Sequence, residues 1–115
     1  MLIDRESLRL SATTSLFEGG PHDVGLSIFF VDYAPGTSAR LHVHPRPEVF
    51  IIESGEAVFA VDDEEITALA GQILIAPANK RHRFRSTGAV SSRSINVVPS
   101  GEMAFTWLED EPTDG

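Results

Sequence analysis

The stretch that decides how this chain folds reads Gly36-Thr-Ser-Ala-Arg-Leu-His42-Val-His44-Pro-Arg-Pro-Glu48-Val-Phe-Ile-Ile-Glu-Ser-Gly55. A β-strand turns successive side chains to opposite faces, so His42 and His44 are expected to point the same way. Pro45 and Pro47 cannot donate to a strand ladder and indicate a bend. Beyond the bend, Glu48 begins an apolar run. Two imidazoles and a carboxylate can therefore converge on one point, and they are a ligand set for a first-row transition metal.

This stretch resembles the first signature of the cupin superfamily, glycine-x5-His-x-His-x3-Glu-x6-glycine. Gly36, His42, His44, Glu48 and Gly55 match every fixed position of that pattern.

A second stretch, residues 71–86, resembles the second cupin signature, glycine-x5-proline-x-glycine-x2-His-x3-asparagine. Gly71, Pro77 and His82 match it, whereas Asn79 replaces the second glycine and Ser86 replaces the asparagine. The glycine is expected to serve a turn with positive φ, which asparagine tolerates best among the other residues. Ser86 changes whatever local hydrogen bond the asparagine makes. Together the two signatures imply one divalent metal ion, held by His42, His44, Glu48 and His82.

The rest of the chain reads as short strands separated by turn signals, which predicts an antiparallel all-β fold. Helical signals are nearly absent, and the best candidate is residues 5–10. The resemblance implies a single cupin β-barrel, also described as a double-stranded β-helix or jelly roll, over residues 24–108. An N-terminal segment (1–23) precedes it, and an acidic tail (109–115), expected to be mobile, follows. The expected strands are 24–33, a short strand carrying His42 and His44, then 48–53, 56–61, 66–70, 72–76, 81–86, 91–99 and 102–108.

Composition limits the function classes. The chain has 115 residues, enough for one domain with one core. Its formal net charge of −8 argues against nucleic acid, whose binding depends on basic residues that neutralise phosphates. It has no cysteine and no apolar run of the ~20 residues that a membrane helix needs. Its N-terminus is charged too early for a secretion signal, so a cytoplasmic protein is the default expectation.

Several residues near the signatures have two interpretations. Glu48 can be a metal ligand or the partner of Arg40 or Arg46 in an ion pair; burial beside imidazoles favours coordination.

His22 is expected at the surface. The arginines that alternate with His82 and Phe84 are expected on the solvent face of their strand. A further set can line a substrate pocket, although core packing, or exposure in the case of Arg40, is the favoured interpretation of each member. These residues are Arg40, Phe50, Phe84, Met103, Phe105 and Trp107.

The function remains open between two classes. One is a metal-dependent enzyme of dioxygenase, isomerase or decarboxylase type, which would act on a small anionic compound that chelates through oxygen. The other is a non-catalytic module that binds metal and a small molecule. The sequence slightly favours an enzyme, with dioxygenase chemistry as first choice, and does not choose among iron, manganese, zinc and nickel. The resemblance also implies a homodimer, because Val49 and Ile51 are expected to face away from the interior and need a cover.

Overall fold

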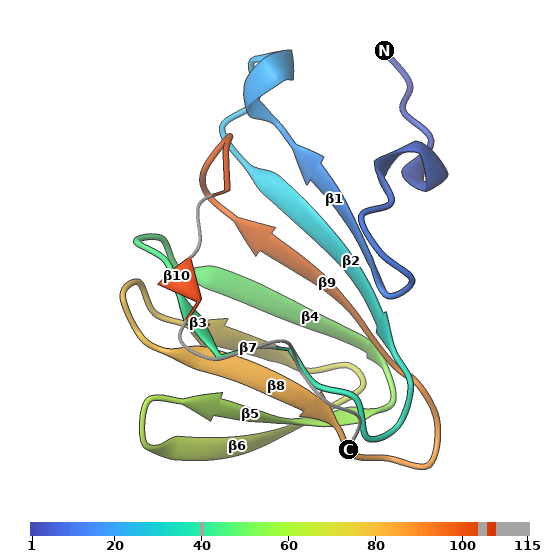
Figure 1. The fold of residues 1–115 in the computed structure, drawn as a ribbon, viewed down its shortest axis with the longest axis vertical. Coiled ribbons are helices and arrows are strands. Elements are labelled where there is room, and N and C mark those ends of the chain that lie inside the picture. Colours follow the sequence, from blue (N-terminus) through green and yellow to red (C-terminus); the bar gives the residue numbers. More distant parts are fainter. Residues whose placement is uncertain (40, 104–105, 108–115) are drawn as a thin grey trace.

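The computed structural model of the chain describes residues 1–39, 41–103 and 106–107. In that part the chain forms ten β-strands and two short 3₁₀ helices (Figure 1). No helix of the described part is long and apolar enough to cross a membrane. The elements are η1 (Arg5–Leu8), β1 (Thr14–Glu18), η2 (Gly20–His22), β2 (Ser27–Tyr33), β3 (His42–Val43), β4 (Glu48–Ser54), β5 (Glu56–Val61), β6 (Glu64–Leu69), β7 (Ile73–Ala76), β8 (His82–Ser86), β9 (Ser92–Val98) and β10 (Thr106–Trp107).

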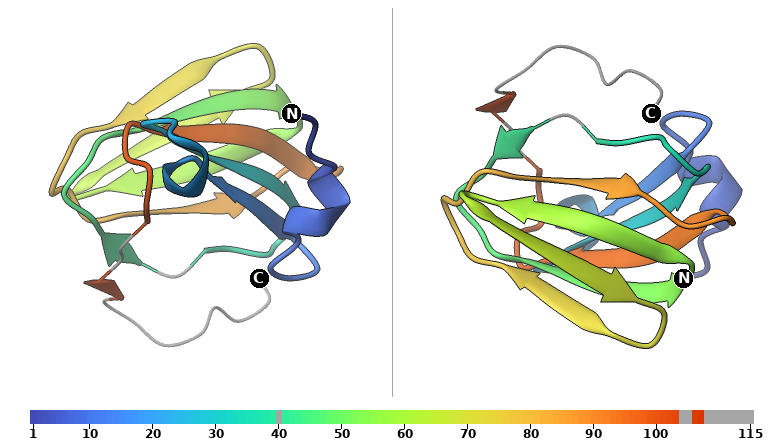
Figure 2. Two further views of the ribbon diagram at one scale, coloured as in Figure 1. Left: turned by 90° about the horizontal axis from the view of Figure 1, so that it is seen from above. Right: turned by 90° about the horizontal axis from the view of Figure 1, so that it is seen from below.

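The strands form two antiparallel sheets that curve around a shared interior (Figures 1 and 2). The first sheet has the order β1-β2-β9-β4-β7, and the second has the order β10-β3-β8-β5-β6. Both sheets mix strands that are distant in sequence, since β9 lies between β2 and β4 and β8 lies between β3 and β5. The prediction of an all-β, antiparallel fold is confirmed, but the described strands form a sandwich of two sheets and not the closed barrel that was expected.

The predicted strands between residues 24 and 99 are present with shifted ends. β3 covers His42 and Val43 only, so His44 lies just beyond the strand. The helical candidate at residues 5–10 is a single 3₁₀ turn, η1. Strand β1 was not expected, and it pairs with β2 along its whole length. The acidic tail, residues 109–115, lies outside the described residues.

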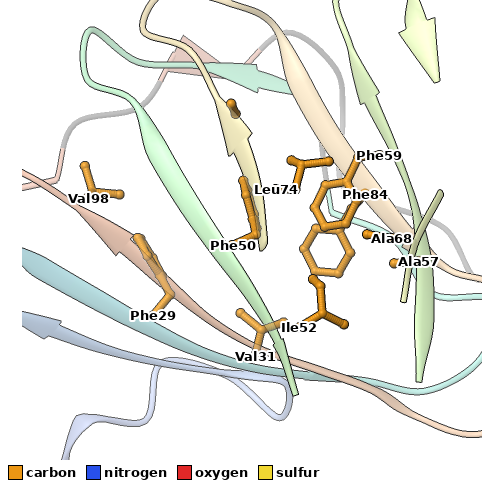
Figure 3. Close-up of a cluster of buried hydrophobic side chains, with 11 residues drawn as sticks. Phe29, Val31, Phe50, Ile52, Ala57, Phe59, Ala68, Leu74, Phe84 and Val98 are labelled. Carbon is orange, nitrogen blue, oxygen red and sulfur yellow. The ribbon is translucent and has the colours of Figure 1, made fainter. Parts of the chain in front are cut away.

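The core fills the space between the sheets with inward-facing side chains from both (Figure 3). Three phenylalanines lie at its centre. The ring of Phe59 is 4.9 Å from that of Phe50 and 5.2 Å from that of Phe84, measured between centroids. Aromatic pairs at these separations stabilise a core beyond the area that they bury. Two predicted pocket residues, Phe50 and Phe84, are thus core residues.

The outer face of the first sheet is unusually apolar. Cross-strand pairing aligns its outward side chains in two adjacent rows, and directly opposed residues in an antiparallel ladder share a face. One row is Phe17, Ile28, Val97, Val49 and Ile75, and the next is Ser15, Phe30, Ile95, Ile51 and Ile73. At the edge strand β7, Ile73 and Ile75 are 64% and 62% exposed. Val49 and Ile51 face away from the interior, as predicted.

Candidate metal centre

The four predicted metal ligands meet at one end of the interior. His42 lies in β3 and is paired directly with His82, the first residue of β8 in the same sheet. Glu48 is the first residue of β4, in the opposite sheet. His44 lies in the bend that connects β3 to β4. The ends of three strands from both sheets therefore place these side chains together, and all four residues are buried.

The separation of the ligand atoms fits a metal ion. One ligand atom from each of the four residues lies within 4.8 Å of the others. Nitrogen and oxygen ligands lie about 2.0–2.2 Å from a zinc ion, so two ligands of one ion are at most about 4.4 Å apart. The imidazole rings pack together, with 4.3 Å between the centroids of His42 and His82 and 4.9 Å between those of His44 and His82. The ligand atoms therefore lie nearly as close together as the ligands of one ion.

The carboxylate of Glu48 connects the cluster. His44 donates from Nε2 to Glu48 Oε1 over 3.0 Å, and His82 donates from Nε2 to the same oxygen over 3.3 Å. Burial is the largest single influence on the pKa of Glu48 and raises it, but the hydrogen bonds and charges of the two imidazoles together outweigh it. The pKa of Glu48 falls from 4.5 to about 2. The carboxylate is thus an anion at any physiological pH and needs a positive partner.

The His82 ring is held so that one nitrogen faces the cluster. Burial lowers its pKa, but the hydrogen bonds to Glu48 and to the Lys80 carbonyl and the charge of Glu48 raise it more, so the pKa of His82 lies above 6.5. Nδ1 donates to the Lys80 carbonyl oxygen over 3.0 Å. A bond of this kind fixes the ring orientation and leaves Nε2 available as a metal ligand once that nitrogen loses its proton.

Turn residues of both signatures place the ligands. Asn79 has a φ of 62°, which confirms the prediction that it takes the place of a glycine with positive φ. Its backbone N–H donates to the carbonyl oxygen of His44 over 3.0 Å, so the second signature anchors a ligand of the first. Gly55 has a φ of 74°, and a Cβ there would lie 2.5 Å from the Ser91 carbonyl oxygen. Only glycine fits that approach.

The departure at Ser86 leaves a polar atom unsatisfied. Ser86 is fully buried, and its Oγ has no hydrogen-bond partner among the described residues. The backbone of Ser86 holds the turn that begins at Gly36. The Ser86 carbonyl accepts from the Gly36 N–H over 2.7 Å, and the Ser86 N–H donates to the Thr37 carbonyl over 3.0 Å. The loss of the asparagine side chain therefore does not release the Gly36 turn.

The other predicted site residues divide into three groups. Phe50 borders the cluster, with its ring centroid 6.1 Å from that of His82, and Phe84 and Met103 lie in or against the core. Trp107, in β10, pairs through its backbone with His42 in β3. Arg40 and Phe105 lie outside the described residues.

The surface predictions are also confirmed. His22 is exposed, and its ring stacks on Phe17 with 5.5 Å between centroids. Arg81, Arg83 and Arg85 are exposed, whereas His82 and Phe84 between them are buried. Arg46 is exposed, and Glu48 contacts His44 and His82.

Two surface hollows lie away from the cluster. One, of about 420 Å³, lies between η1 and the outer face of the first sheet, and its lining includes Arg5, Phe30 and Arg93. The other, of about 200 Å³, lies on the second sheet around Arg83 and Arg85. Neither is lined by any of the four clustered residues. The concentration of buried ionisable groups, rather than the size of a hollow, identifies the chemical site.

Sequence reasoning missed one group of buried polar residues, on the inner face of β9. Ser92, Ser94 and Asn96 face the interior. The sequence contains a pattern that could have predicted this group, because Ser92, Ser94 and Asn96 alternate with Arg93, Ile95 and Val97 and so share one face of the strand.

The family model described as "Cupin domain" matches residues 29–98 of the chain. The chain is 37% identical over 62 residues to Protein SchB of Streptomyces halstedii, which covers 53% of this chain and 45% of SchB. It is 33% identical over 79 residues to Polyketide synthase CurC of Streptomyces cyaneus, which covers 65% of this chain and 51% of CurC. The chain thus spans about half the length of these curated relatives.

A solved structure of Bacillus subtilis oxalate decarboxylase, described with Mn(II) centres, has a similar fold. Its TM-score is 0.77 at 18% identity, over 85% of this chain and 29% of that one. A likeness at this level of identity concerns the fold alone.

Removal of single ligands should abolish metal binding and leave the fold intact. We expect His42→Ala, His44→Ala and Glu48→Ala each to weaken metal affinity by more than about 100-fold, since loss of an outer-sphere partner alone costs 10–100-fold. Metal content after dialysis, with circular dichroism to check the fold, measures this effect. His22→Ala is the matched control, because this histidine is exposed. Full metal content in all three ligand variants would contradict the assignment.

Metal affinity should fall as the pH falls through the neutral range. His82, with its pKa raised above 6.5, must lose a proton to coordinate, whereas Glu48, with a pKa of about 2, is already ionised. Below the pKa of His82, each unit of pH should therefore cost about tenfold in apparent affinity per proton displaced. Calorimetric titration with Zn²⁺ between pH 8 and 6, in buffers of different ionisation enthalpy, counts the protons released. An affinity that is independent of pH would show that no ring of the cluster loses a proton.

Proposed function

Because the chain belongs to the cupin domain family, we propose that it is a metal-dependent enzyme acting on a small anionic compound that chelates through oxygen. The observation that carries the proposal is the buried cluster of His42, His44, Glu48 and His82. Three neutral imidazoles and one carboxylate contribute a single negative charge, so a divalent ion would leave the site positive. A positive, buried site favours an anionic ligand.

The donor set supports a metal that is active rather than merely structural. Structural zinc sites favour four thiolate or imidazole ligands, and this cluster has no thiolate. Imidazole with carboxylate suits iron, manganese, zinc or nickel, so the identity of the ion stays open. When bound, such an ion supplies Lewis acidity and, if it is redox-active, electron transfer.

The residues of the chain have separate tasks in this proposal. His42, His44 and His82 hold the ion, and Glu48 balances part of its charge. Phe50 and the core behind it keep one side of the site dry, which strengthens electrostatic interactions there. Glu48 is a poor general base while it is a ligand. Chemistry that depends on the ion therefore fits better than simple proton abstraction by the protein, and dioxygenase, isomerase and decarboxylase types all remain within the proposal.

The similarity to Polyketide synthase CurC favours a polyketide-like compound as substrate. Polyketides carry 1,3-dicarbonyl groups or a phenol next to a carbonyl, and both present two oxygens to a metal and form anions easily. We do not infer that the chain acts on oxalate, the compound in the name of the structural neighbour, because only the fold is shared at 18% identity.

We also propose that a second copy of the chain covers the two apolar rows on the outer face of the first sheet. These rows cross all five strands; Ile73 and Ile75 are exposed, and the other apolar members are half-buried. Contiguous apolar surface of this kind marks an interaction site. Asp32 and Arg93 border the rows with 3.7 Å between their charged groups, so the margin carries both signs of charge. A face of this kind is self-complementary about a two-fold axis, the commonest symmetry of protein assemblies.

Metal-loaded protein should bind two-oxygen chelators that the metal-free protein does not bind. We expect acetylacetone and 2-hydroxyacetophenone to bind the Zn²⁺-loaded and Fe²⁺-loaded forms in calorimetry, with oxygen uptake followed in parallel for iron. Turnover should fall in Glu48→Gln, which removes the one negative ligand. Equal binding to the metal-free form would remove the metal from the mechanism. Binding without turnover for iron, manganese, zinc and nickel, across a panel of polyketide-like compounds, would indicate the non-catalytic module.

The assembly should depend on Ile73 and Ile75. Light scattering should give wild-type protein a mass twice the 12.5 kDa of the chain, and the double variant Ile73→Lys, Ile75→Lys should give a monomer. Lysine lowers the net negative charge, so a larger overall charge cannot explain dissociation. Val90→Lys is the matched control, because Val90 is as exposed as Ile75, at 62%, but lies in a loop. A monomeric wild type, or a dimer that persists in the double variant, would contradict this assignment.

A further inference from the structure

The inner face of β9 carries buried polar side chains where the neighbouring strands carry apolar ones. Ser92, Ser94 and Asn96 are only 4%, 7% and 4% exposed. Burial of polar groups costs free energy unless they are hydrogen-bonded, so such a stripe calls for a structural or chemical reason. Ser92 has a structural reason, because its hydroxyl donates to the Glu56 carbonyl oxygen over 3.3 Å.

Strand register places Asn96 next to the metal centre. Asn96 is directly opposite Phe50 in β4 and Phe29 in β2. Glu48 lies two residues before Phe50, so it points from the same face of β4 one step closer to the end that holds the cluster. Diagonal neighbours of this kind lie about 7–8 Å apart in a sheet. An asparagine amide therefore reaches a compound bound at the cluster without itself reaching the ion.

Ser94 sets the orientation of the Asn96 amide. The Ser94 hydroxyl donates to Asn96 Oδ1 over 2.8 Å. Ser94 is opposite Ile52, one step farther from the cluster than Asn96, so Oδ1 is turned away from the cluster. The Nδ2 group then points toward the cluster end of the interior. Ser94 thus occupies Oδ1, and it leaves Nδ2, which can donate two hydrogen bonds, on the side of the amide that faces the cluster.

We propose that Asn96 orients the substrate by donating a hydrogen bond from Nδ2 to an oxygen of the chelating compound that is not bound to the metal. Ser94 is the positioning residue, because it holds the amide in the orientation that presents Nδ2. This inference rests on the proposed function, since it requires a compound at the metal. It adds a preference: the site should favour compounds with a third oxygen beside the two that chelate.

Two matched probes test the preference. 2-Hydroxyacetophenone offers the two chelating oxygens, and 2,6-dihydroxyacetophenone adds a third. The Co²⁺-loaded protein reports binding of either probe through its visible absorption, independently of any turnover. We expect wild-type protein to bind the three-oxygen probe more tightly. Asn96→Ala should weaken binding of the three-oxygen probe by about two- to tenfold, the value of one hydrogen bond to a neutral hydroxyl, and leave binding of the two-oxygen probe nearly unchanged.

Three further variants separate orientation from packing. Asn96→Asp should weaken the binding of both probes, because a second carboxylate beside the site repels the anionic form of each probe. Ser94→Ala should reproduce part of the Asn96→Ala effect, whereas Ser92→Ala, in the same stripe but bonded to Glu56, should bind both probes as wild type does. Co²⁺ affinity and the thermal midpoint are measured for each variant. If Asn96→Ala does not fold, Asn96→Ser takes its place, because it keeps a small polar group but cannot reach the probe.

The outcomes distinguish this inference from the proposed function. Equal affinity of wild type and Asn96→Ala for the three-oxygen probe, with both proteins loaded with Co²⁺, would overturn the role of Asn96 and leave the proposed function standing. If Asn96→Ala weakened the binding of both probes equally, the role of Asn96 would also be overturned, because the effect would then not depend on the third oxygen. Failure of wild-type protein to bind Co²⁺, or equal binding of the probes to metal-free protein, would overturn the proposed function itself.

Discussion

The structure depends on the burial of one carboxylate among three imidazoles. Glu48 is only 4% exposed, and its pKa of about 2 shows that the surrounding groups stabilise the anion more than burial destabilises it. Removing both His44 and His82 would leave an unpaired buried charge, which is strongly destabilising, whereas a single replacement leaves Glu48 with one imidazole partner. The positions of β3, β4 and β8 are therefore coupled, because the ends of these strands must bring their side chains to the same point. The same requirement makes the cluster a ready ligand set for a cation.

The two signatures of the sequence act on each other through backbone contacts. The N–H of Asn79 holds the carbonyl of His44, and the carbonyl of Lys80 holds Nδ1 of His82. A single turn, residues 77–80, thus orients one ligand from each signature. This arrangement explains why a residue with positive φ is needed at position 79, which itself supplies no ligand atom. It also explains why asparagine, which tolerates that conformation, preserves the site.

Much of this could be predicted from the sequence where the chemistry of a residue dictates its surroundings. The spacing of His42, His44 and Glu48 predicted their convergence, and the alternation around His82 predicted which side of β8 faces inward. Strand β1 was not predicted, because Thr14–Glu18 is short, has no clear alternation, and is stabilised by pairing with a strand that the local sequence does not reveal. Asn96 was missed for a related reason. Its position beside Glu48 follows from the pairing of β9 with β4, which joins residues far apart in the chain. The reaction could not be predicted, since it depends on the compound that meets the metal.

The central claim is that His42, His44, Glu48 and His82 bind one metal ion together. The most direct test is X-ray absorption spectroscopy at the metal edge, on protein loaded with one equivalent of Zn²⁺ or Fe²⁺. We predict a first shell of nitrogen and oxygen at about 2.0–2.2 Å, with the outer-shell scattering of three imidazole rings. A spectrum with only light oxygen ligands and no imidazole scattering would contradict the account, because it would place the ion on surface carboxylates.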